Sequence, residues 1–381
     1  MTERPSVLHF TTTGAIAGTE QAVLDLSEAH DRRKWQVSFG TLFSPGEMNL
    51  RIQQNGAPCY SMGVASPLDI PISVVRLAIL LRRLKIDVLH THLVHAGLVG
   101  VFAARLSGLR SIKLVHTRHH SDELHRFGPA YKAKMDAYVA HAQHLVCANS
   151  EAARSVLTEL EGVSASKIRL TYPGVHLTRL YSRVTDPSGE SIRRELGYSE
   201  DHQLVGSVAH LLPKKGHEYL LRAMVAVVDR DPMARLVIAG RGPERERLEQ
   251  LTRDLGIIDF VQFLGYRGDI PNVVNTLDLL VQPSLEEAFG LSMVEGMALG
   301  KPIVGSNVGG IPEVIDSGVT GTLTPPGDAR ALAEAILNLL ADSAMRTKFG
   351  SAGRDRAERL FTIPRLAADY ESAWSEVLDH E

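Results

Sequence analysis

Two glutamates, Glu287 and Glu295, flank the point where a loop enters a predicted helix. The strand-like run Asp278–Gln282 precedes them, and the chain turns at Gly290 before an apolar helical stretch begins. The first N–H groups of a helix have no acceptor within that helix, so they can bind an anion. This combination of strand end, loop and helix N-terminus predicts a phosphate site with a carboxylate on either side.

A bound phosphate would explain the spacing of the two acids. Seated on the N–H groups of Phe289, Gly290 and Leu291, it would lie between the reaches of Glu287 and Glu295. Each carboxylate could then bind hydroxyl groups on its own side of a diphosphate, which is the outline of a sugar nucleotide. The alternative, two unrelated acids at a helix start, does not account for Glu295, because the helix around it is predicted to be buried and a carboxylate there needs a polar partner.

Cations stand ahead of a second predicted helix. Lys214, Lys215 and Gly216 come shortly after a predicted strand, and His210 lies at the end of that strand. A lysine at a helix N-terminus is unfavourable unless an anion lies nearby, because the helix dipole is positive at that end. The pattern therefore favours a phosphate partner over the alternative of two solvated surface lysines.

Other loops that follow predicted strands add candidates for the same ligand. Gly14 and Gly18 bracket a loop ahead of a helix, although their GxxxG spacing differs from the GxGxxG of dinucleotide-binding enzymes. An ordinary tight turn is the alternative for this pair. Gly242 and Tyr266 follow two further strands, and we expect them to line the donor site.

Histidines are dense in the first half of the chain. They are His90, His92, His95, His116, His119, His120 and His125. His90 and His92 lie two positions apart on a predicted strand, so their side chains share a face. A zinc site is conceivable, but no HExxH or CxxC framework accompanies these residues. We therefore expect no metal, and we expect some of these histidines to line a cleft as neutral hydrogen-bonding groups.

Short apolar or β-branched runs alternate with helical stretches along the whole chain. The predicted strands are Ser6–Phe10, Gln36–Phe43, Val88–Thr91, Lys113–Thr117, Leu145–Ala148, Ile168–Tyr172, Leu204–Ala209, Arg235–Ala239, Phe260–Phe263, Leu279–Gln282, Pro302–Ser306 and Gly321–Leu323. The predicted helices include Thr19–Ala29, Ile72–Leu84, Glu151–Glu159 and a C-terminal series over Ala329–Glu381 interrupted at Pro364. This alternation is typical of β-α-β units on parallel sheets.

The alternation occurs in two series separated by a polar passage, Ser182–Gly189, which has the composition of a linker. We therefore expect an α/β protein with two Rossmann-like domains that face each other across a cleft, over residues 1–183 and 184–363. The last helix carries an apolar face that needs a surface to cover. That face comprises Leu366, Tyr370, Ala373, Trp374 and Val377.

Bulk composition narrows the class of protein. The 381 residues are 44% hydrophobic and 22% charged, which suits a globular protein of two domains. A net charge of −3 gives no reason to expect nucleic acid as a partner. Two cysteines give no disulfide framework, and no apolar run is long enough to span a bilayer. We expect a cytoplasmic protein without a signal peptide.

The chain resembles the retaining glycosyltransferases of family four, which have the GT-B fold and an E-x7-E signature. The resemblance rests mainly on the run Pro283–Gly305, which contains Glu287 and Glu295 at that spacing. Further matching segments are Pro213–Gly216, Ile238–Pro243, Phe263–Gly265, Gly309–Glu313, Asp87–His92, Ala148–Ser150 and Tyr172–Gly174. The resemblance implies a C-terminal helix, residues 364–381, that crosses back to complete the N-terminal domain.

The resemblance also implies a role for each site residue. Glu287 would hold hydroxyls of the transferred sugar, and Glu295 would hold the ribose. Lys215 would pair with the diphosphate, helped by the N–H groups of Gly290 and Leu291.

Residues of the N-terminal domain would complete this site. The loop at Gly14 would approach the phosphates, and His119 would lie near the reacting carbon, where it helps to stabilise developing positive charge. The donor would be a nucleotide-diphosphate sugar, no cofactor or metal would be required, and the sugar would be transferred with retention to a hydroxyl group.

Two positions depart from the family pattern. Ala209 and His210 replace a Gly-Arg pair, so one permanent cation at the diphosphate becomes a histidine that is charged only when protonated. His176 replaces the aspartate that commonly follows the turn before it.

Other functions on the same fold stay open at this stage. They are a sugar-nucleotide epimerase, a phosphorylase and a non-catalytic sugar-nucleotide-binding protein. The acceptor is not predicted, because the loops Ser44–Asn49, Val64–Ile70 and Ser121–Tyr131 carry no motif. Arginines and Lys85 on one side of the helix Ile72–Lys85 agree with contact to a membrane or a lipid-linked acceptor. The alternative is an ordinary helix that covers a sheet.

Overall fold

The computed structural model describes residues 4–15, 18–121 and 129–379. The chain divides into two compact units: an N-terminal unit of residues 1–174 and 363–381, and a C-terminal unit of residues 175–362. The segment from Val175 belongs to the C-terminal unit because the Val175 N–H donates to the Phe361 carbonyl (2.9 Å) and the Tyr181 hydroxyl donates to Glu358 (2.7 Å). The expected boundaries, 183/184 and 363/364, fall nine residues and one residue after the two division points.

The N-terminal unit is built on a seven-stranded parallel sheet of order β3-β2-β1-β4-β5-β6-β7. Its strands are β1 (Ser6–Thr11), β2 (Gln36–Phe43), β3 (Cys59–Val64), β4 (Val88–His92), β5 (Lys113–Arg118), β6 (Leu145–Ala148) and β7 (Ile168–Leu170). The sequence analysis missed β3, in which glycine and polar residues interrupt the apolar pattern. Its edge position in the sheet explains that composition.

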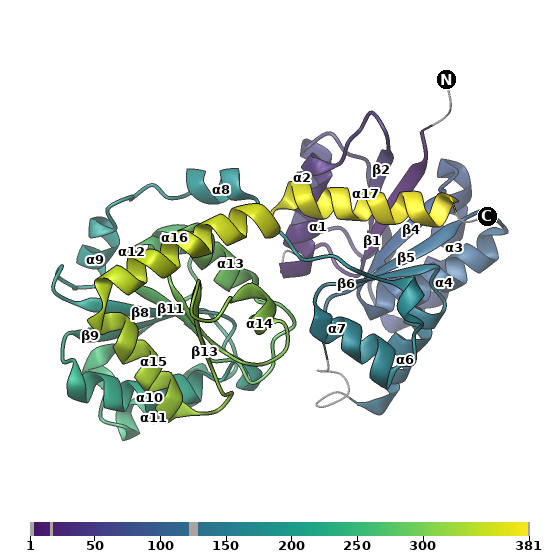
Figure 1. The fold of residues 1–381 in the computed structure, drawn as a ribbon. Coiled ribbons are helices and arrows are strands. Elements are labelled where there is room, and N and C mark those ends of the chain that lie inside the picture. Colours follow the sequence, from purple (N-terminus) through teal and green to yellow (C-terminus); the bar gives the residue numbers. More distant parts are fainter. Residues whose placement is uncertain (1–3, 16–17, 122–128, 380–381) are drawn as a thin grey trace. The chain divides into compact units, whose positions relative to one another are not determined.

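Helices cover both faces of this sheet (Figure 1). They are α1 (Gly18–Ala29), α2 (Glu47–Gln54), α3 (Ile70–Leu84), α4 (Val94–Ser107), α6 (Ala130–His141), α7 (Glu151–Ser155) and α17 (Ile363–Asp379). Alternate residues of β1 point to opposite faces: Leu8 packs with α3 and α4, whereas Val7 packs with α17. His9 lies on the α17 side, because its ring contacts Trp374.

The last helix, α17, buries the whole apolar face that the sequence predicted for it. Leu366, Tyr370, Trp374 and the other residues of that face are at most 5% exposed and pack on strands of the N-terminal unit. The predicted interruption at Pro364 is wrong. The helix series breaks instead at Asp342 and at Phe361–Thr362, and Pro364 lies in the first turn of α17, where a proline needs no N–H donor.

The C-terminal unit has a six-stranded parallel sheet of order β10-β9-β8-β11-β12-β13. Its strands are β8 (Gln203–Val208), β9 (Ala234–Ala239), β10 (Val261–Gly265), β11 (Leu279–Gln282), β12 (Ile303–Ser306) and β13 (Gly321–Thr324). All six were predicted. Two units with parallel sheets flanked by helices confirm the predicted Rossmann-like fold class.

Helices also lie on both faces of the second sheet (Figure 1). They are α8 (Leu177–Ser182), α9 (Glu190–Glu195), α10 (His217–Arg230), α11 (Arg245–Asp254), α12 (Ile270–Thr276), α13 (Leu291–Ala298), α14 (Ile311–Val314), α15 (Ala329–Ala341) and α16 (Ser343–Leu360). Leu279 and Val281 pack into the core with α10 and α15. Leu280 between them contacts α13 at Gly296, so this strand is buried on both faces.

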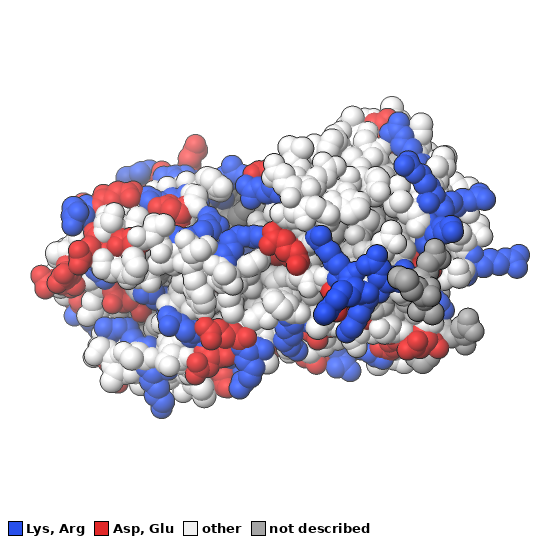
Figure 2. All heavy atoms as spheres, turned by 90° about the horizontal axis from the view of Figure 1, so that it is seen from above, with Lys and Arg blue, Asp and Glu red and all other residues white. Residues whose placement is uncertain are grey.

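The surface carries both signs of charge. Figure 2 shows acidic and basic side chains interspersed over much of one face, together with one dense group of Lys and Arg. Among the described residues, no helix is both long enough and apolar enough to cross a membrane.

Candidate active site

The candidate residues of the C-terminal unit lie at the switch point of its sheet. β8 and β11 are neighbours in the sheet although β9 and β10 separate them in sequence. At such a point the connections leave in opposite directions, which opens a crevice beyond the strand ends where ligands of this fold class bind. The loop to Lys215 follows β8, and the loop to Glu287 follows β11.

Backbone contacts join these two loops. The N–H groups of Leu285 and Glu286 both donate to the Lys214 carbonyl, at 2.8 and 3.3 Å. Gly216 has φ +67°, and a Cβ added there would lie 2.0 Å from the Pro283 carbonyl oxygen. A glycine is therefore needed for both the backbone conformation and the close approach of the loops.

Two lysine–glutamate pairs cross between the loops. Lys215 Nζ lies 2.5 Å from Glu287 Oε2, and Lys214 Nζ lies 3.2 Å from Glu286 Oε2. The side chains of Lys215 and Glu287 are 16% and 11% exposed, whereas the Glu286 side chain is 2% exposed. Glu286 therefore serves as a buried structural partner. Lys215 and Glu287 stay accessible to a ligand.

Two further elements position Glu287. The Gln282 amide nitrogen lies 3.3 Å from Glu287 Oε2, and the Gly310 N–H donates to the Glu287 carbonyl at 3.0 Å. Gly309 has φ +55°, and a Cβ there would come within 1.9 Å of the same carbonyl oxygen. The backbone of Glu287 is thus held by a glycine pair from the loop after β12.

The helix that begins after this loop is α13, at the predicted position. Gly290 precedes it with φ +97°, a conformation that favours glycine. The helix is largely buried, as predicted, but Glu295 is only half-buried. Phe289 is buried, and its ring makes an edge contact with Phe361 at 5.3 Å between centroids. Leu291 opens the helix and is half-buried.

The remaining donor-site candidates of this unit lie on neighbouring loops. His210 is exposed. Gly242 packs closely on Leu211, since a Cβ added at Gly242 would lie 2.3 Å from the Leu211 carbonyl oxygen. Tyr266 is 74% exposed, and the Arg241 guanidinium lies 5.2 Å from its ring centre. These loops follow β8, β9 and β10, which are adjacent in the sheet.

Two residues of this site were missed by the sequence analysis. Gln282 links Ser284, Ser292 and Glu287 by side-chain contacts of 2.8 to 3.4 Å. It was read only as the last residue of a strand. Arg241 is an exposed cation beside the loop of His210, since its carbonyl accepts the Leu211 N–H at 2.9 Å. A polar residue at the end of a buried strand was the available signal for Gln282.

His176, the second departure from the family pattern, has a structural role in the fold. Its Nδ1 accepts the Arg179 N–H at 3.2 Å and caps α8. A side-chain acceptor at this position satisfies one of the free N–H groups at the helix start, as an aspartate would.

The N-terminal candidates occupy strand ends of their own unit. Gly14 is buried, and a Cβ there would lie 2.2 Å from Asn49 Oδ1, so packing within this unit requires a glycine. Gly18 opens α1 and is exposed, with open space around a Cβ. Residues 16 and 17 of the Gly14–Gly18 loop lie outside the described ranges. His125 lies outside them as well.

His119 directly follows β5 and lines a pocket of about 390 Å³ with residues that include Thr12, His95 and Lys132. Just before it, the Arg118 guanidinium is buried between Asp136 (2.5 Å) and Glu161 (2.6 Å), which fixes the end of the strand. Burial lowers the pKa of His119 to about 3, so the imidazole is neutral.

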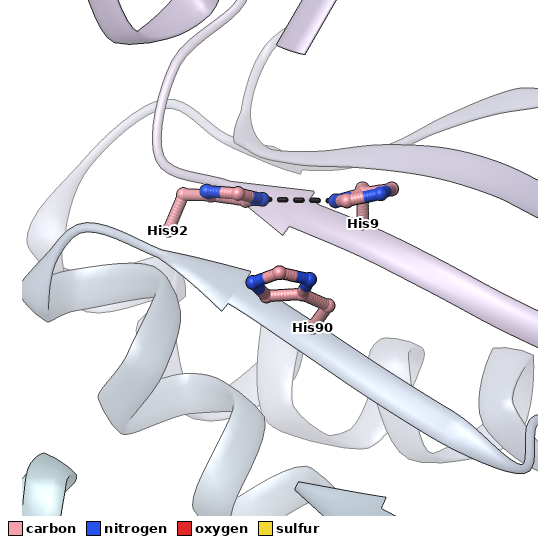
Figure 3. Close-up of side chains that lie close together, drawn as sticks. All are labelled: His9, His90 and His92. Atoms are coloured by element: carbon pink, nitrogen blue, oxygen red, sulfur yellow. Dashed lines mark hydrogen bonds between the residues drawn. The ribbon is translucent and has the colours of Figure 1, made fainter. Parts of the chain in front are cut away.

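His9, His90 and His92 form a buried cluster on β1 and β4 (Figure 3), in which one nitrogen of each lies within 4.8 Å of the others. This spacing raises the question of a metal, but the nitrogens are engaged. His9 Nδ1 and His92 Nε2 are 2.9 Å apart, and His90 lies between Thr117 Oγ1 (2.7 Å) and Trp374 Nε1 (3.1 Å). Indole nitrogen only donates, so His90 Nδ1 accepts and Nε2 carries the proton. The cluster fits a hydrogen-bonded core better than a metal site.

Two Rossmann-like units, each with a parallel sheet flanked by helices, are the architecture of the GT-B class of glycosyltransferases. Comparisons with known proteins agree. Residues 16–179 match the family model described as Glycosyltransferase Family 4, and residues 188–356 match Glycosyl transferases group 1. The chain is 30% identical over 312 residues to a D-inositol 3-phosphate glycosyltransferase of Corynebacterium aurimucosum, covering 77% of this chain and 73% of the relative. The chain therefore belongs to the glycosyltransferases of family 4.

Other relatives and solved structures are similar over most of the chain. N-acetyl-alpha-D-glucosaminyl L-malate synthase of Bacillus anthracis is 27% identical over 320 residues, which is 84% of this chain and 82% of that protein. Anabaena HepE in complex with UDP-glucose superposes with a TM-score of 0.84 at 25% identity, over 97% of this chain and 99% of HepE. Sucrose-phosphate synthase of Thermosynechococcus elongatus shares the fold, with a TM-score of 0.80 at 24% identity over 99% and 100% of the two chains.

Proposed function

We propose that the protein is a retaining glycosyltransferase that moves a hexose-type sugar from a nucleotide-diphosphate sugar to a hydroxyl group. The observation that carries the proposal is the pairing of Lys215 with Glu287 at the switch point of the second sheet, beside the N-terminus of α13. The similarity to HepE, whose structure contains UDP-glucose, supports a donor of this class.

The donor would occupy the space shared by these groups. Its diphosphate binds the N–H groups of Phe289, Gly290 and Leu291 and takes Lys215 as its counter-ion. Glu287 then leaves the lysine and accepts hydroxyl groups of the sugar, while Glu295 binds the ribose. Gln282 remains beside Glu287 and helps to hold its carboxylate.

Electrostatics drive the chemical step in this proposal. Breaking the bond between the sugar and the phosphate leaves negative charge on the phosphate and positive charge on the anomeric carbon. Lys215, His210 and the helix N-terminus stabilise the phosphate charge, a role that a divalent metal fills in other enzymes. One preorganised hydrogen-bond donor at such a site lowers the activation free energy by about 3–4 kcal/mol.

Retention follows if the leaving phosphate takes the proton of the acceptor. The phosphate, still held by Lys215, accepts that proton while the acceptor oxygen bonds to the anomeric carbon on the face from which the phosphate departs. His119 is the residue of the N-terminal unit that we assign to the reacting carbon.

The acceptor is a hydroxyl on a small molecule, a glycan or a lipid-linked compound. Exposed Ile72, Val75 and Ile79 share α3 with exposed Arg82 and Arg83. Apolar and basic groups on one helix suit peripheral contact with an anionic membrane, which would bring the protein to a lipid-linked acceptor.

Thermal unfolding of the purified protein with a panel of nucleotide-diphosphate sugars tests this function. A donor at 100 times its Kd should stabilise the protein by about 2.7 kcal/mol. That donor is then incubated with hydroxyl acceptors, and NMR determines the anomeric configuration of the product. Retained configuration in a product that requires a separate acceptor supports the proposal. An inverted product, or conversion of the donor without any acceptor into an epimer, contradicts it.

A further inference from the structure

Four histidine rings connect the pocket at His119 to a carboxylate on α17. The contacts run from Glu371 Oε1 to His30 Nδ1 (3.2 Å), from His30 Nε2 to His9 Nε2 (3.1 Å), from His9 Nδ1 to His92 Nε2 (2.9 Å), and from His92 Nδ1 to His119 Nε2 (3.0 Å). All five residues belong to the N-terminal unit. Figure 3 shows the central link, with the rings of His9 and His92 end to end.

At the Glu371 end of this row of side chains, the contacts of the carboxylate fix the direction of the first hydrogen bond. Glu371 Oε1 also accepts the Asp31 N–H at 2.9 Å, so this oxygen is an acceptor. His30 must therefore donate to it through Nδ1–H. A neutral imidazole carries one proton, which leaves His30 Nε2 as an acceptor.

The remaining three hydrogen bonds follow in the same direction. Because His30 Nε2 accepts, His9 must donate through Nε2–H, and its Nδ1 accepts from His92 Nε2–H. His92 Nδ1 then accepts from His119 Nε2–H. His119 is left with an unprotonated Nδ1, for which no hydrogen-bond partner is present among the residues that the structure covers.

Burial keeps the inner rings neutral, as this reasoning requires. His9, His30 and His92 are at most 7% exposed, and desolvation lowers the pKa of each. The pKa of Glu371 is lowered despite partial burial, because His30 and the Asp31 N–H donate to its carboxylate. Other titratable or charged groups that face the chain are Asp31, His90, His116, His120 and Tyr370.

We propose that Glu371, His30, His9 and His92 form a tautomer lock that holds the Nδ1 of His119 as a hydrogen-bond acceptor toward its pocket. The four residues are positioning residues, since they act only through His119. A carboxylate that orients a histidine through one hydrogen bond is a known device in enzymes. Here the carboxylate orients His30, and the hydrogen bonds of His9 and His92 pass that orientation on to His119.

The lock gives His119 a defined role toward a substrate. An acceptor nitrogen in the pocket takes a hydrogen bond from a hydroxyl group and so orients its proton, whereas an N–H there could only donate to the hydroxyl oxygen. This consequence for sugar transfer rests on the proposed function above. The tautomers themselves do not, so spectroscopy tests the lock whatever reaction the protein catalyses.

Protein labelled with ¹⁵N-histidine provides the test, through two-bond ¹H–¹⁵N correlations at pH 7.5. The lock predicts the Nε2–H tautomer for His9, His92 and His119 and the Nδ1–H tautomer for His30. E371L removes the outer acceptor and should give a mixture of tautomers at His119, whereas E371Q keeps an acceptor oxygen and should preserve the Nε2–H form.

Two further variants complete the design. E376L removes another carboxylate of α17, one that pairs with Arg169 and has no link to the histidines, and should leave every tautomer unchanged. H30F interrupts the lock and should reproduce the mixture seen in E371L. An Nδ1–H tautomer at His119 in the wild-type protein, or an unchanged spectrum in both E371L and H30F, overturns the lock. Zinc binding that shifts the nitrogens of His9 and His92 overturns it as well.

A kinetic measurement then relates the lock to turnover. E371L should lower kcat about tenfold or more with a smaller change in the KM of the donor, and E376L should match the wild type. Equal turnover of E371L and the wild type, with the tautomers altered as predicted, would show that the proposed role of His119 in catalysis is wrong. A wild-type protein without transferase activity would contradict the proposed function and leave the spectroscopic result standing.

Discussion

Lys215 Nζ and Glu287 Oε2 lie 2.5 Å apart, although 72 positions separate the two residues in the sequence. In the proposed donor complex these side chains bind different parts of the ligand: the lysine binds the diphosphate and the carboxylate binds the sugar. The ion pair holds both groups at the crevice beside α13. Donor binding must therefore exchange this contact for two contacts with the ligand.

Replacing either member of the pair should abolish most of the activity and spare the fold. We expect K215A and E287Q each to reduce kcat/KM by about 100-fold or more, because each removes a group that stabilises the transition state. The pair is partly exposed, so its loss should change stability little. Circular dichroism and thermal unfolding provide the control. Wild-type turnover in both variants would contradict the assignment of these residues.

The backbone at Glu287 can be tested through glycine. G309A places a Cβ at φ +55° and within 1.9 Å of the Glu287 carbonyl oxygen, so the loop must move. G318A is a matched control, since Gly318 has φ +80° with open space around it. The control should lose about 1–2 kcal/mol of unfolding free energy from backbone strain alone.

G309A should lose more stability than this control and should also weaken donor binding. Urea unfolding and titration with the donor measure the two effects. If both variants bind the donor equally well, the glycine pair does not position Glu287.

A permanent cation at position 210 should strengthen donor binding. Arginine is charged at every working pH and can bind a phosphate with two N–H groups, whereas the imidazole of histidine cannot. We expect H210R to bind the donor more tightly than the wild-type protein. Calorimetric titration of both proteins at pH 7.5 measures the difference. Equal affinities would exclude His210 from the diphosphate site.

The N-terminal unit should be unusually sensitive to acid. Burial lowers the pKa of His9, His90 and His92 well below the ordinary value of 6.5, and that of His116 to about 3. Below pH 6.5 the unfolded chain takes up protons that the folded unit does not, so stability falls as the pH falls. Each such histidine contributes a slope of about 1.4 kcal/mol per pH unit until its folded pKa is reached.

Tryptophan fluorescence can follow this unfolding selectively, because the only two tryptophans of the chain, Trp35 and Trp374, lie in the N-terminal unit. Urea unfolding between pH 7.5 and pH 4.5 should show the decrease, and H116Q should reduce the slope by one proton. A free energy of unfolding that stays constant over this range would mean that these histidines are charged in the folded unit.

The sequence was sufficient to predict the strand ends at which the candidate residues lie. Runs of apolar residues marked twelve strands, and ligands of parallel sheets bind beyond the strand ends, so Lys215 and Glu287 were selected from their positions after such runs. The missed strand, Cys59–Val64, lies at a sheet edge, where the need for an apolar pattern is weaker. The Lys215–Glu287 contact was not predictable, because it depends on the order of strands in space.

The histidine chain shows a second limit of sequence reasoning. His92 and His119 were noticed because they occur in a dense group, but His9, His30 and Glu371 stand alone on β1, after α1 and on α17. Nothing in their spacing relates them, since the contact between His30 and Glu371 spans 341 positions. Packing of the last helix on the first sheet brings them together, and only a three-dimensional structure contains that information.

Calorimetric titration of wild-type protein, K215A and E287Q with the donor and with its nucleoside diphosphate tests the central claim most directly. If Lys215 binds the diphosphate and Glu287 binds the sugar, K215A should weaken both ligands by a similar factor. E287Q should weaken only the nucleotide sugar, and it should leave the nucleoside diphosphate bound as tightly as before or more tightly, because Lys215 is released from its partner. Equal losses for both ligands in E287Q, or unchanged binding in K215A, would contradict the account.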